Sequence, residues 1–452
     1  MTIYALSTAP GRAGIAVIRI SGRLARNALD ALCHGRFPAS RVASFRRLRH
    51  PHTGEVLDEA VVLWLPGPAS FTGEDVAELH VHGGRAVAAG VLEALASFGL
   101  RLAEPGEFTM RAFGNGKIDL TEAEGLADLI NAETAYQRRQ AIAQHCGALR
   151  GHYELWRATL LSAMAYVEAS LDFSDEGDVG QNPFDEAVPI VRGLVGELER
   201  ALADDHRGEI VREGIQVAIV GAPNVGKSSL LNALAGREAA IVFHEPGTTR
   251  DVIEVALDLD GFPFVLRDTA GLRKTESPVE QEGIRRALAS AREADIVLLM
   301  YDAAAASTGT ASLPGGESWR EGGQAEASRT ITVINKIDLA RPDLSRWPQG
   351  TLLISVKTGQ GLDALRTKLI RFAEESFGGR ETPLITRARH RQEIGHARSA
   401  LNQFLGSAEA SEHPEIAAEH LRAAADALGR LTGRLDVEDV LGQIFSEFCI
   451  GK

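Results

Sequence analysis

A glycine-rich loop between an apolar segment and a helix-forming segment is the feature that most constrains this chain. Residues 221–229 read Gly-Ala-Pro-Asn-Val-Gly-Lys-Ser-Ser, which matches the phosphate-binding pattern GxxxxGK[ST]. The apolar residues 215–220 before the loop suit a strand, and residues 229–234 after it suit a helix. A chance glycine-rich turn would not need this order of strand, loop and helix. The context therefore predicts a phosphate-binding domain built on a doubly wound, mostly parallel sheet.

The residues of this loop have separate expected roles. Gly221 and Gly226 allow main-chain N–H groups to point at phosphates, where the helix N-terminus adds positive potential. Lys227 is expected to reach the β- and γ-phosphates and to act in catalysis. Ser228 is expected to bind Mg²⁺ through its hydroxyl, because this ion prefers oxygen ligands. The loop thus predicts a nucleoside triphosphate bound with Mg²⁺.

Three later segments indicate which nucleotide is bound. Asp268-Thr269-Ala270-Gly271 follows an apolar strand, so its Asp can hold the Mg²⁺ shell through water and its Gly can donate to the γ-phosphate. Asn335-Lys336-Ile337-Asp338 ends another strand, and its last carboxylate can accept from the N1–H and N2–H of guanine, a donor pair that adenine lacks. Ser355-Val356-Lys357 resembles the loop that closes over the base in small GTPases. Each segment alone could be an ordinary strand end, but their order predicts GTP.

A switch region is expected after the phosphate loop. In Gly247-Thr248-Thr249, the second threonine is expected to bind Mg²⁺ in the GTP state and so to take part in catalysis. Leu272 stands where many GTPases have a glutamine that orients the attacking water. Arg250 and Arg273 are candidates for an arginine finger, although such arginines are more often solvated. Because leucine cannot orient water, the acceptor must come from elsewhere, and the acidic candidates are Glu276, Glu280 and Glu282.

Composition restricts the partners and the compartment. The content of 44% hydrophobic and 24% charged residues is ordinary for a soluble protein. A net charge of −13 repels free nucleic acid on average, so RNA binding would need a basic partner or a local patch. The candidate patches are residues 46–50 and 387–391, and both are better explained as solvated surfaces.

Cys33, Cys146 and Cys449 have no metal-ligand spacing, which favours a reducing compartment. Without an apolar leader or span, we expect a cytoplasmic protein that contacts no membrane.

The residue pattern changes along the 452 residues and predicts a multidomain protein with α/β and α parts. Residues 1–118 contain alternating segments such as 15–21 and 76–81, which predict a mixed α+β domain. Helical pattern follows, opening with an expected capping box from Thr121 to Glu124. We expect one helical domain, residues 119–212 and 376–452, with the nucleotide domain 213–375 inserted in it. Within its first part a buried apolar stripe is expected at Trp156, Leu160, Met164, Val167 and Leu171.

Four more segments resemble a known family. They are Phe71-Thr72-Gly73-Glu74-Asp75-Val76, Gly106-Glu107-Phe108-Thr109-Met110-Arg111-Ala112-Phe113, Asn115-Gly116-Lys117-Ile118-Asp119-Leu120 and the ending Phe448-Cys449-Ile450-Gly451-Lys452. Together they closely resemble the MnmE family of tRNA modification GTPases, also called TrmE, over essentially the whole chain. The resemblance implies a tetrahydrofolate-binding N-terminal domain, a split helical domain and an inserted G domain of the TrmE type.

The resemblance also implies an activity and partners. It implies a potassium-stimulated GTPase that forms a homodimer and a heterotetramer with an FAD-dependent MnmG-type partner. The complex would add a carboxymethylaminomethyl group, or a related aminomethyl one, to C5 of wobble uridine in certain tRNAs. The folate, as 5-formyl- or 5,10-methylene-tetrahydrofolate, would supply the one-carbon unit. By the same resemblance, the folate site is assigned to Arg19, Glu78, Lys117 and Lys452.

The same resemblance assigns the residues that bind potassium and the residue that helps catalysis. The resemblance makes Glu280 the residue that helps to orient water, and it makes a potassium ion the charge that replaces an arginine finger. The chain departs from the family pattern in Val242-Phe243-His244-Glu245-Pro246-Gly247, where the proline restricts the residue before it. The potassium ligands are expected to be Asn224, Phe243, Glu245 and Thr248.

The sequence predicts both the catalytic residues of the nucleotide site and the residues that contact GTP. The residues expected to act in catalysis are Lys227, Thr249 and Glu280. The residues expected to contact GTP are Asn224, Val225, Gly226, Lys227, Ser228, Ser229, Phe243, His244, Glu245, Pro246, Gly247, Thr248, Thr249, Asp268, Thr269, Ala270, Gly271, Asn335, Lys336, Asp338, Ser355, Val356 and Lys357.

Two other functions stay open on the sequence. A regulatory GTPase that binds RNA or ribosomal particles would explain the nucleotide domain equally well, but it would not need the N-terminal hundred residues or the Cys449–Lys452 ending. A folate-dependent aminomethyltransferase regulated by GTP is less well supported, because no general base accompanies the folate residues. Cys449 is either a nucleophile toward uridine C6 or a buried structural thiol.

Overall fold

The computed structural model describes most of the chain as two compact units. It covers residues 1–172, 183–237, 240–241, 253–268, 291–308, 329–378, 382–409, 414–435, 438–446 and 448–452. The first unit contains Met1–Ala127, Gln144–Gly196 and Glu393–Lys452, and the second contains Asp128–Ala143 and Glu197–Gln392. Over these covered residues, no helix has the length and apolar character needed to cross a membrane. The expected domain limits after residues 118, 212 and 375 stay predictions.

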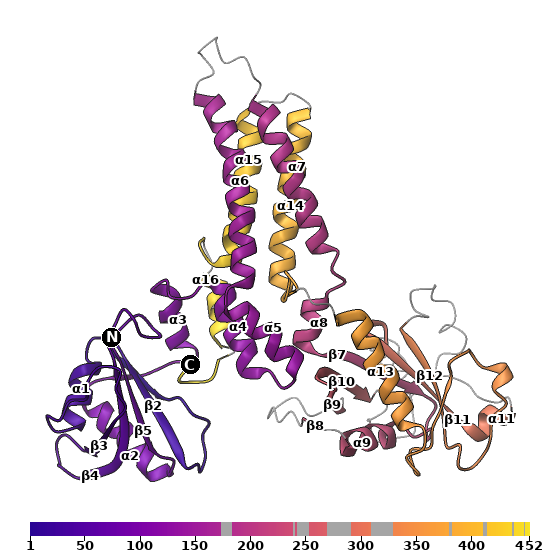
Figure 1. Cartoon of the computed structure of the whole chain (residues 1–452), viewed down its shortest axis with the longest axis horizontal. Helices are drawn as coiled ribbons and strands as arrows, with labels where there is room; N and C mark the ends of the chain where they lie inside the picture. Colours follow the sequence, from indigo (N-terminus) through magenta and orange to yellow (C-terminus); the bar gives the residue numbers. More distant parts are fainter. Residues whose placement is uncertain are drawn as a thin grey trace, which may run out of the picture. The chain divides into compact units, whose positions relative to one another are not determined.

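The N-terminal part of the first unit is a six-stranded sheet in the order β3-β4-β5-β2-β1-β6 (Figure 1). All neighbouring strands are antiparallel except β1 and β6, which are parallel. Alternating burial along β2 and β5 places one face of the sheet against α1 and α2, which confirms the predicted mixed α+β domain. The bounds are β1 Ile3–Leu6, β2 Ile15–Ser21, β3 Ser44–Arg49, β4 Val56–Leu65, β5 Val76–His82, β6 Arg101–Leu102, α1 Ala25–Leu32 and α2 Arg85–Ser97.

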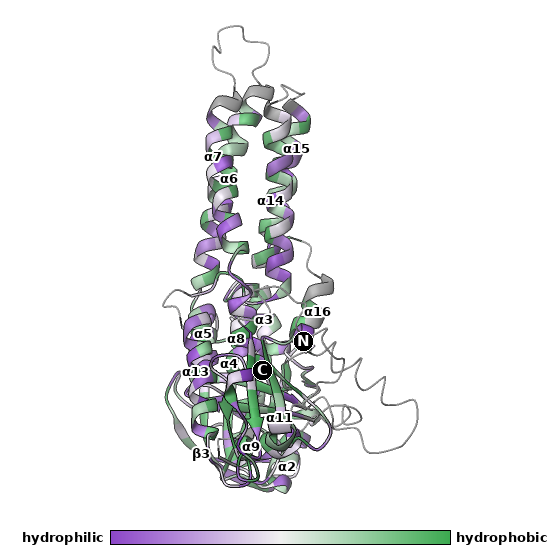
Figure 2. Cartoon of the chain, turned by 90° about the vertical axis from the view of Figure 1, so that its right-hand side faces the viewer, coloured by the Kyte–Doolittle hydropathy of each residue, from purple (hydrophilic) through white to green (hydrophobic). Residues whose placement is uncertain are grey.

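Helices form the rest of the first unit, and α6 packs along α15. Polar and apolar residues mix along both helices (Figure 2), as expected where only one face is buried. Trp156, Leu160 and Val167 of α6 are buried, as the predicted stripe requires, and Met164 is half-buried, whereas the side chain of Leu171 lies outside the described residues. The helices, of which α4, α7 and α14 extend into the second unit, are α3 Glu107–Gly114, α4 Leu120–Asn131, α6 Ala148–Asp172, α7 Pro183–Leu202, α14 Ala388–Glu409, α15 Pro414–Thr432 and α16 Glu438–Ser446.

The start of α4 is capped by Asp119, so the predicted capping box from Thr121 to Glu124 is wrong by two residues. The main-chain N–H of Asp119 donates to Glu122 Oε2 (2.7 Å), and the N–H of Glu122 donates to Asp119 Oδ1 (2.8 Å). Thr121 lies inside the helix and donates its hydroxyl to Asp119 Oδ1 (2.8 Å). The two hydrogen bonds between Asp119 and Glu122 form a capping box, because the two residues are three positions apart. Aspartate is as good an N-cap residue as threonine or better.

The second unit contains a seven-stranded sheet in the order β13-β12-β11-β7-β10-β9-β8. The strands from β13 to β10 are parallel, and β9 and β8 are antiparallel to their neighbours. Successive residues of β7 are buried on opposite faces, as expected for a sheet covered on both sides, which confirms the doubly wound, mostly parallel fold. The bounds are α5 Ala135–His145, α8 Arg207–Glu213, β7 Ile215–Gly221, α9 Lys227–Arg237, β8 Ala240–Ile241, β9 Ile253–Leu259, β10 Phe262–Asp268, β11 Ile296–Asp302, α11 Ala303–Thr308, β12 Thr330–Asn335, β13 Leu352–Leu353 and α13 Leu362–Phe377.

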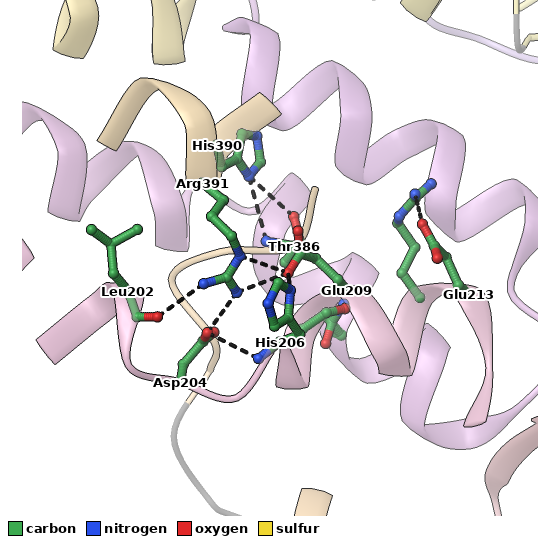
Figure 3. A network of polar contacts seen from close by, with 11 residues as sticks. Leu202, Asp204, His206, Glu209, Glu213, Thr386, His390 and Arg391 are labelled. Carbon is green, nitrogen blue, oxygen red and sulfur yellow. Dashed lines mark hydrogen bonds and ion pairs between the residues drawn. The ribbon is translucent and has the colours of Figure 1, made fainter. Parts of the chain in front are cut away.

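Arg391, near the start of α14, ties together segments that precede and follow the sheet in the chain. Its guanidinium donates to Asp204 Oδ1 (2.7 Å), Glu209 Oε2 (2.8 Å) and the carbonyl of Leu202 (2.9 Å) (Figure 3). His206 Nδ1 lies 2.5 Å from the same Glu209 oxygen. Burial would lower the pKa of Arg391, but the two carboxylates outweigh it and raise this pKa. The charged cluster therefore fixes the start of α14 against α8 within the second unit.

Candidate nucleotide-binding site

The glycine-rich loop lies between β7 and α9, as the sequence predicts. β7 ends at Gly221 and α9 begins at Lys227. Gly226 has a φ of 107°, and a Cβ atom there would lie 2.5 Å from Asn335 Nδ2, so only glycine fits without displacing that side chain. Asn224 is also left-handed, with a φ of 62°. Val225 is buried, whereas Asn224, Ser228 and Ser229 are exposed.

Lys227 places its ammonium inside the curve of the loop. Its Nζ donates to the carbonyls of Gly221 (2.8 Å) and Ala222 (3.0 Å), and the residue is buried. The lysine is also the first residue of α9, so its charge adds to the positive end of the helix. The arrangement fits a phosphate group, because an ammonium and a helix N-terminus converge on one short loop.

Asn335 joins the phosphate loop to the loop expected at the base. Its Nδ2 donates to the carbonyl of Val225 (2.9 Å), and its Oδ1 accepts from the N–H of Val356 (3.1 Å). The residue is 3% exposed; its hydrogen bond to Val225 is buried and the one from Val356 is partly buried. The sequence predicts Asn335 as a nucleotide contact, and the structure shows it holding two predicted contact loops together.

Lys336 and Asp338 lie in the segment that follows Asn335. Lys336 has a φ of 66°, and its Nζ donates to the carbonyl of Asn224 (2.7 Å) and lies 2.7 Å from Asp302 Oδ2. Asp338 is exposed, and its Oδ1 accepts from the Oγ of Ser355 (2.7 Å). Burial would raise the pKa of Asp302, but hydrogen bonds from Lys336 and nearby amides outweigh it and lower this pKa.

Sequence reasoning missed Asp302. It is the last residue of β11 and lies directly opposite Asn335 in the parallel pairing of β11 with β12. A carboxylate at the end of a strand next to the predicted Asn-Lys-Ile-Asp segment is the signal that would have found it. Asp302 positions the Lys336 ammonium against the phosphate loop.

Part of the predicted site lies outside the described residues. The backbone of Asp268 ends β10 and lies beside Ile219 of β7, close to the start of the phosphate loop, but its side chain is not described. The predicted residues wholly outside the description are Phe243, His244, Glu245, Pro246, Gly247, Thr248, Thr249, Thr269, Ala270, Gly271 and Glu280.

Replacing Asn335 by alanine is expected to lower the free energy of unfolding of the second unit by about 2 kcal/mol, because a buried carbonyl and a partly buried N–H lose their partner. Hydrogen exchange of residues 221–230 and 352–358 would measure the change. Thr351→Ala is the control, since the hydroxyl bond from Thr351 to Pro348 (2.7 Å) is exposed and should be worth about 0.5 kcal/mol or less. Equal exchange in both variants would contradict the role of Asn335.

The residues assigned to folate lie in the first unit, where Arg19 and Glu78 form one pair. Arg19 Nη2 lies 2.9 Å from Glu78 Oε1, and the two side chains are 17% and 16% exposed. The pairing follows from the sheet, because these residues are opposite each other in β2 and β5. The Arg19 guanidinium lies 5.6 Å from the ring of Phe71 and 5.7 Å from that of Phe108. The Arg19 guanidinium therefore lies near two aromatic rings, of which Phe108 is fully buried.

The other two assigned residues lie on loops of the same unit. The carbonyl of Lys452 accepts from the N–H of Phe108 (3.2 Å), which brings the C-terminus to the ring next to Arg19. The Nζ of Lys117 donates to the carbonyl of Pro68 (3.1 Å). Cys449 is exposed, so it is not the buried structural thiol considered from the sequence.

Glu107, the first residue of α3, binds two arginines of the first unit. It accepts from Arg111 Nη2 (2.9 Å), from the N–H of Glu104 (3.0 Å) and from Arg101. Burial alone would raise the pKa of Glu107, but these hydrogen bonds outweigh it and lower the pKa below its ordinary value. A lowered carboxyl pKa stabilises the fold above the unfolded-state pKa, and this stability is lost as pH falls through the folded-state pKa.

Glu107→Gln is therefore expected to reduce the free energy of unfolding at pH 7 by about 2 kcal/mol and to flatten its decline below pH ~4.5. Hydrogen exchange of residues 101–114 at pH 7 and at acid pH measures both effects. Glu59→Gln serves as the control, because its pair with Arg47 has side chains 57% and 46% exposed and contributes little. An acid profile that does not differ between wild type and Glu107→Gln would rule out this role.

Comparison with known proteins identifies the family. A family model described as the MnmE helical domain matches residues 120–449, and one described as the GTP-binding protein TrmE N-terminus matches residues 2–117. The chain belongs to the MnmE family. A protein named tRNA modification GTPase MnmE from Parvibaculum lavamentivorans is 52% identical over 100% of both chains. The MnmE of Rhodopseudomonas palustris is 50% identical over 100% of this chain and 99% of its own. Membership of the MnmE family confirms the prediction of a GTP hydrolase.

Solved structures of other GTP-binding proteins match part of the chain. The G domain of the T. maritima FeoB iron transporter matches 35% of this chain and 98% of its own length, at 24% identity and a TM-score of 0.24. A TM-score this low supports no conclusion about the chain beyond what its MnmE relatives provide.

Proposed function

We propose that this protein hydrolyses GTP to drive the modification of C5 of wobble uridine in certain tRNAs. It acts as a homodimer, in a heterotetramer with an FAD-dependent MnmG-type partner, and adds a carboxymethylaminomethyl group. The observation that carries the proposal is the buried Asn335, whose hydrogen bonds join the phosphate loop to the loop expected to close over the base, residues 355–357. Relatives that match the full length of the chain are named tRNA modification GTPase MnmE. The cytoplasm is the compartment that this substrate requires.

For GTP hydrolysis, Lys227 supplies a fixed positive charge to the β- and γ-phosphates, and Ser228 supplies an exposed hydroxyl ligand. Bound Mg²⁺ neutralises charge on the phosphate oxygens. We assign Thr249 to a second hydroxyl ligand and Glu280 to the orientation of water, because Leu272 cannot orient it. Asp338 accepts from guanine, and Ser355 holds that carboxylate in place.

Potassium is proposed to bind at Asn224, together with Phe243, Glu245 and Thr248. Asn224 supports this assignment, because its side chain is exposed at the phosphate loop while Lys336 fixes its main-chain carbonyl. Bound potassium supplies positive charge that an arginine finger supplies in other GTPases. GTP turnover should be faster in K⁺ than in Na⁺ and should rise with protein concentration, whereas rates independent of both would refute this part of the proposal.

Folate is proposed to bind at Arg19, Glu78, Lys117 and Lys452. The donor edge of a pterin suits the Glu78 carboxylate, and the cationic groups suit the glutamate tail of the folate. When bound, 5-formyl- or 5,10-methylene-tetrahydrofolate supplies the one-carbon unit of the new group. Cys449 is a candidate nucleophile toward uridine C6, and wild-type modification by a Cys449→Ser variant would exclude that role.

Mass spectrometry of wobble nucleosides from cells that lack this protein tests the proposal. Unmodified uridine, restored by the wild-type gene and not by Lys227→Ala, is the expected result. Normal nucleosides together with a ribosome defect would instead establish a regulatory GTPase that binds ribosomal particles. The second outcome would leave GTP binding intact and overturn the tRNA assignment.

A further inference from the structure

The β9–β10 hairpin extends from the phosphate end of the sheet to helix α5. Its two strands form seven consecutive pairs, with Ile253 opposite Asp268 at one end and Leu259 opposite Phe262 at the other. Asp268 lies beside Ile219 of β7, next to the phosphate loop. At about 3.3 Å per residue, the tip lies about 20 Å along the strands from Asp268. An unbroken ladder of this length links two distant points of the second unit.

Tyr136 of α5 covers the tip of this hairpin. Its ring stacks on that of Phe262, with centroids 3.8 Å apart and planes 18° apart, and Phe262 is 1% exposed. The N–H of Tyr136 also donates to the carbonyl of Gly261 (3.1 Å). Gly261 has a φ of 88°, and a Cβ atom there would lie 3.4 Å from Ala135 Cβ. Helix and hairpin are therefore in contact through both main chain and side chain.

Arg139 holds the Tyr136 ring from its other face. The guanidinium carbon of Arg139 lies 4.0 Å from the ring centroid of Tyr136. Two groups that both lie within about 4 Å of one ring centre cannot share a face, so the Tyr136 ring lies between Arg139 and Phe262. This arrangement restricts the rotation of the ring and makes the contact stiff.

Within the second unit, helix α5 is also hydrogen-bonded to α8 at two points. Gln137 Nε2 donates to the carbonyl of Arg212 (3.1 Å), and Gln140 Nε2 donates to the carbonyl of Gly208 (2.8 Å). The same helix continues beyond Ala143 into residues that belong to the first unit. A change at the hairpin tip therefore acts on a helix whose chain runs on into the other unit.

We propose that the Tyr136–Phe262 stack passes the state of the nucleotide site to α5, and that Tyr136 is a positioning residue that sets the preference of the site between GDP and GTP. The strand ladder transmits a displacement at Asp268 to Gly261, because its main-chain bonds keep the two strands in register. Tyr136 is the side chain that receives this displacement. Coupling between two sites is reciprocal, so the contact at α5 also changes the relative affinity for the two nucleotides. This inference rests on the proposed GTP site.

Hydrogen exchange and nucleotide affinity in the full-length protein test the coupling. In wild type, exchange of residues 135–143 should differ about fivefold between GDP and a non-hydrolysable GTP analogue. Tyr136→Phe keeps the stack and should keep this difference, whereas Tyr136→Ala should abolish it and change the ratio of the two dissociation constants about fivefold. Trp347→Ala is the control, because it removes an edge contact with Tyr301 (4.6 Å) in another part of the same unit.

The outcomes separate this inference from the proposed function. Failure of every protein, wild type included, to bind either nucleotide would refute the GTP site itself. Binding with identical α5 exchange in both nucleotide states, or a Tyr136→Ala variant that keeps the wild-type difference, would overturn the coupling. If Tyr136→Ala unfolds, Tyr136→Leu replaces it, because leucine covers Phe262 without a stacked ring and should also lose the difference.

Discussion

Lys227→Ala is expected to lower kcat for GTP hydrolysis by about 10³-fold. The reason is that Lys227 carries the one positive charge in residues 221–229, and its Nζ already lies inside the loop, 2.8 Å from the carbonyl of Gly221. Alanine retains the helix N-terminus and the main-chain amides, so part of the phosphate binding should survive. The loss should therefore appear more strongly in kcat than in the affinity for GDP.

Steady-state GTPase assays and GDP titrations measure the two effects of Lys227→Ala. The matched control is Lys368→Ala, because Lys368 also donates to a main-chain carbonyl of the second unit, that of Gly350 (3.0 Å), but on the exposed surface. The control should keep its wild-type kcat. A Lys227→Ala enzyme within tenfold of wild type would show that the loop amides alone provide the catalytic charge stabilisation.

The local pattern of the sequence predicts the phosphate loop, because strand, loop and helix follow one another directly. β7 and α9 lie where the apolar run and the helix-forming segment predict them. The apolar stripe that begins at Trp156 is equally local, since helical spacing alone places these side chains on one face. Such features depend on neighbours within a few residues, so one sequence is enough to find them.

Contacts between segments that are distant in the sequence cannot be predicted from local pattern. Asn335 acts on Val225 and Val356, which lie on two other loops, and only the order of strands brings the three together. The sequence analysis places residues 128–143 in the first part of the expected helical domain, and in the structure these residues group with the nucleotide-binding sheet. No periodicity in α5 indicates that Tyr136 stacks on Phe262, because this contact depends on tertiary packing.

Asp338→Asn is expected to weaken GTP binding by about 10³-fold and to create binding of xanthosine triphosphate. The Oγ of Ser355 donates to Asp338 Oδ1 (2.7 Å). An asparagine would keep its oxygen on this donor and direct its Nδ2 toward the base. Guanine presents N–H donors there, so two donors would face each other without an acceptor. Xanthine has a carbonyl in place of the amino group and can accept from Nδ2.

Titration of both proteins with fluorescent GTP and xanthosine triphosphate measures this exchange of specificity. Asp343→Asn is the control, because Asp343 is exposed and uses its carboxylate to cap Ser345 (3.0 Å) on the segment that follows. Wild type and Asp343→Asn should prefer GTP equally. Ser355→Ala should reduce the new preference of Asp338→Asn, because without the hydroxyl the amide can rotate and present either atom to the base. An Asp338→Asn variant that still prefers GTP would mean that another group recognises guanine.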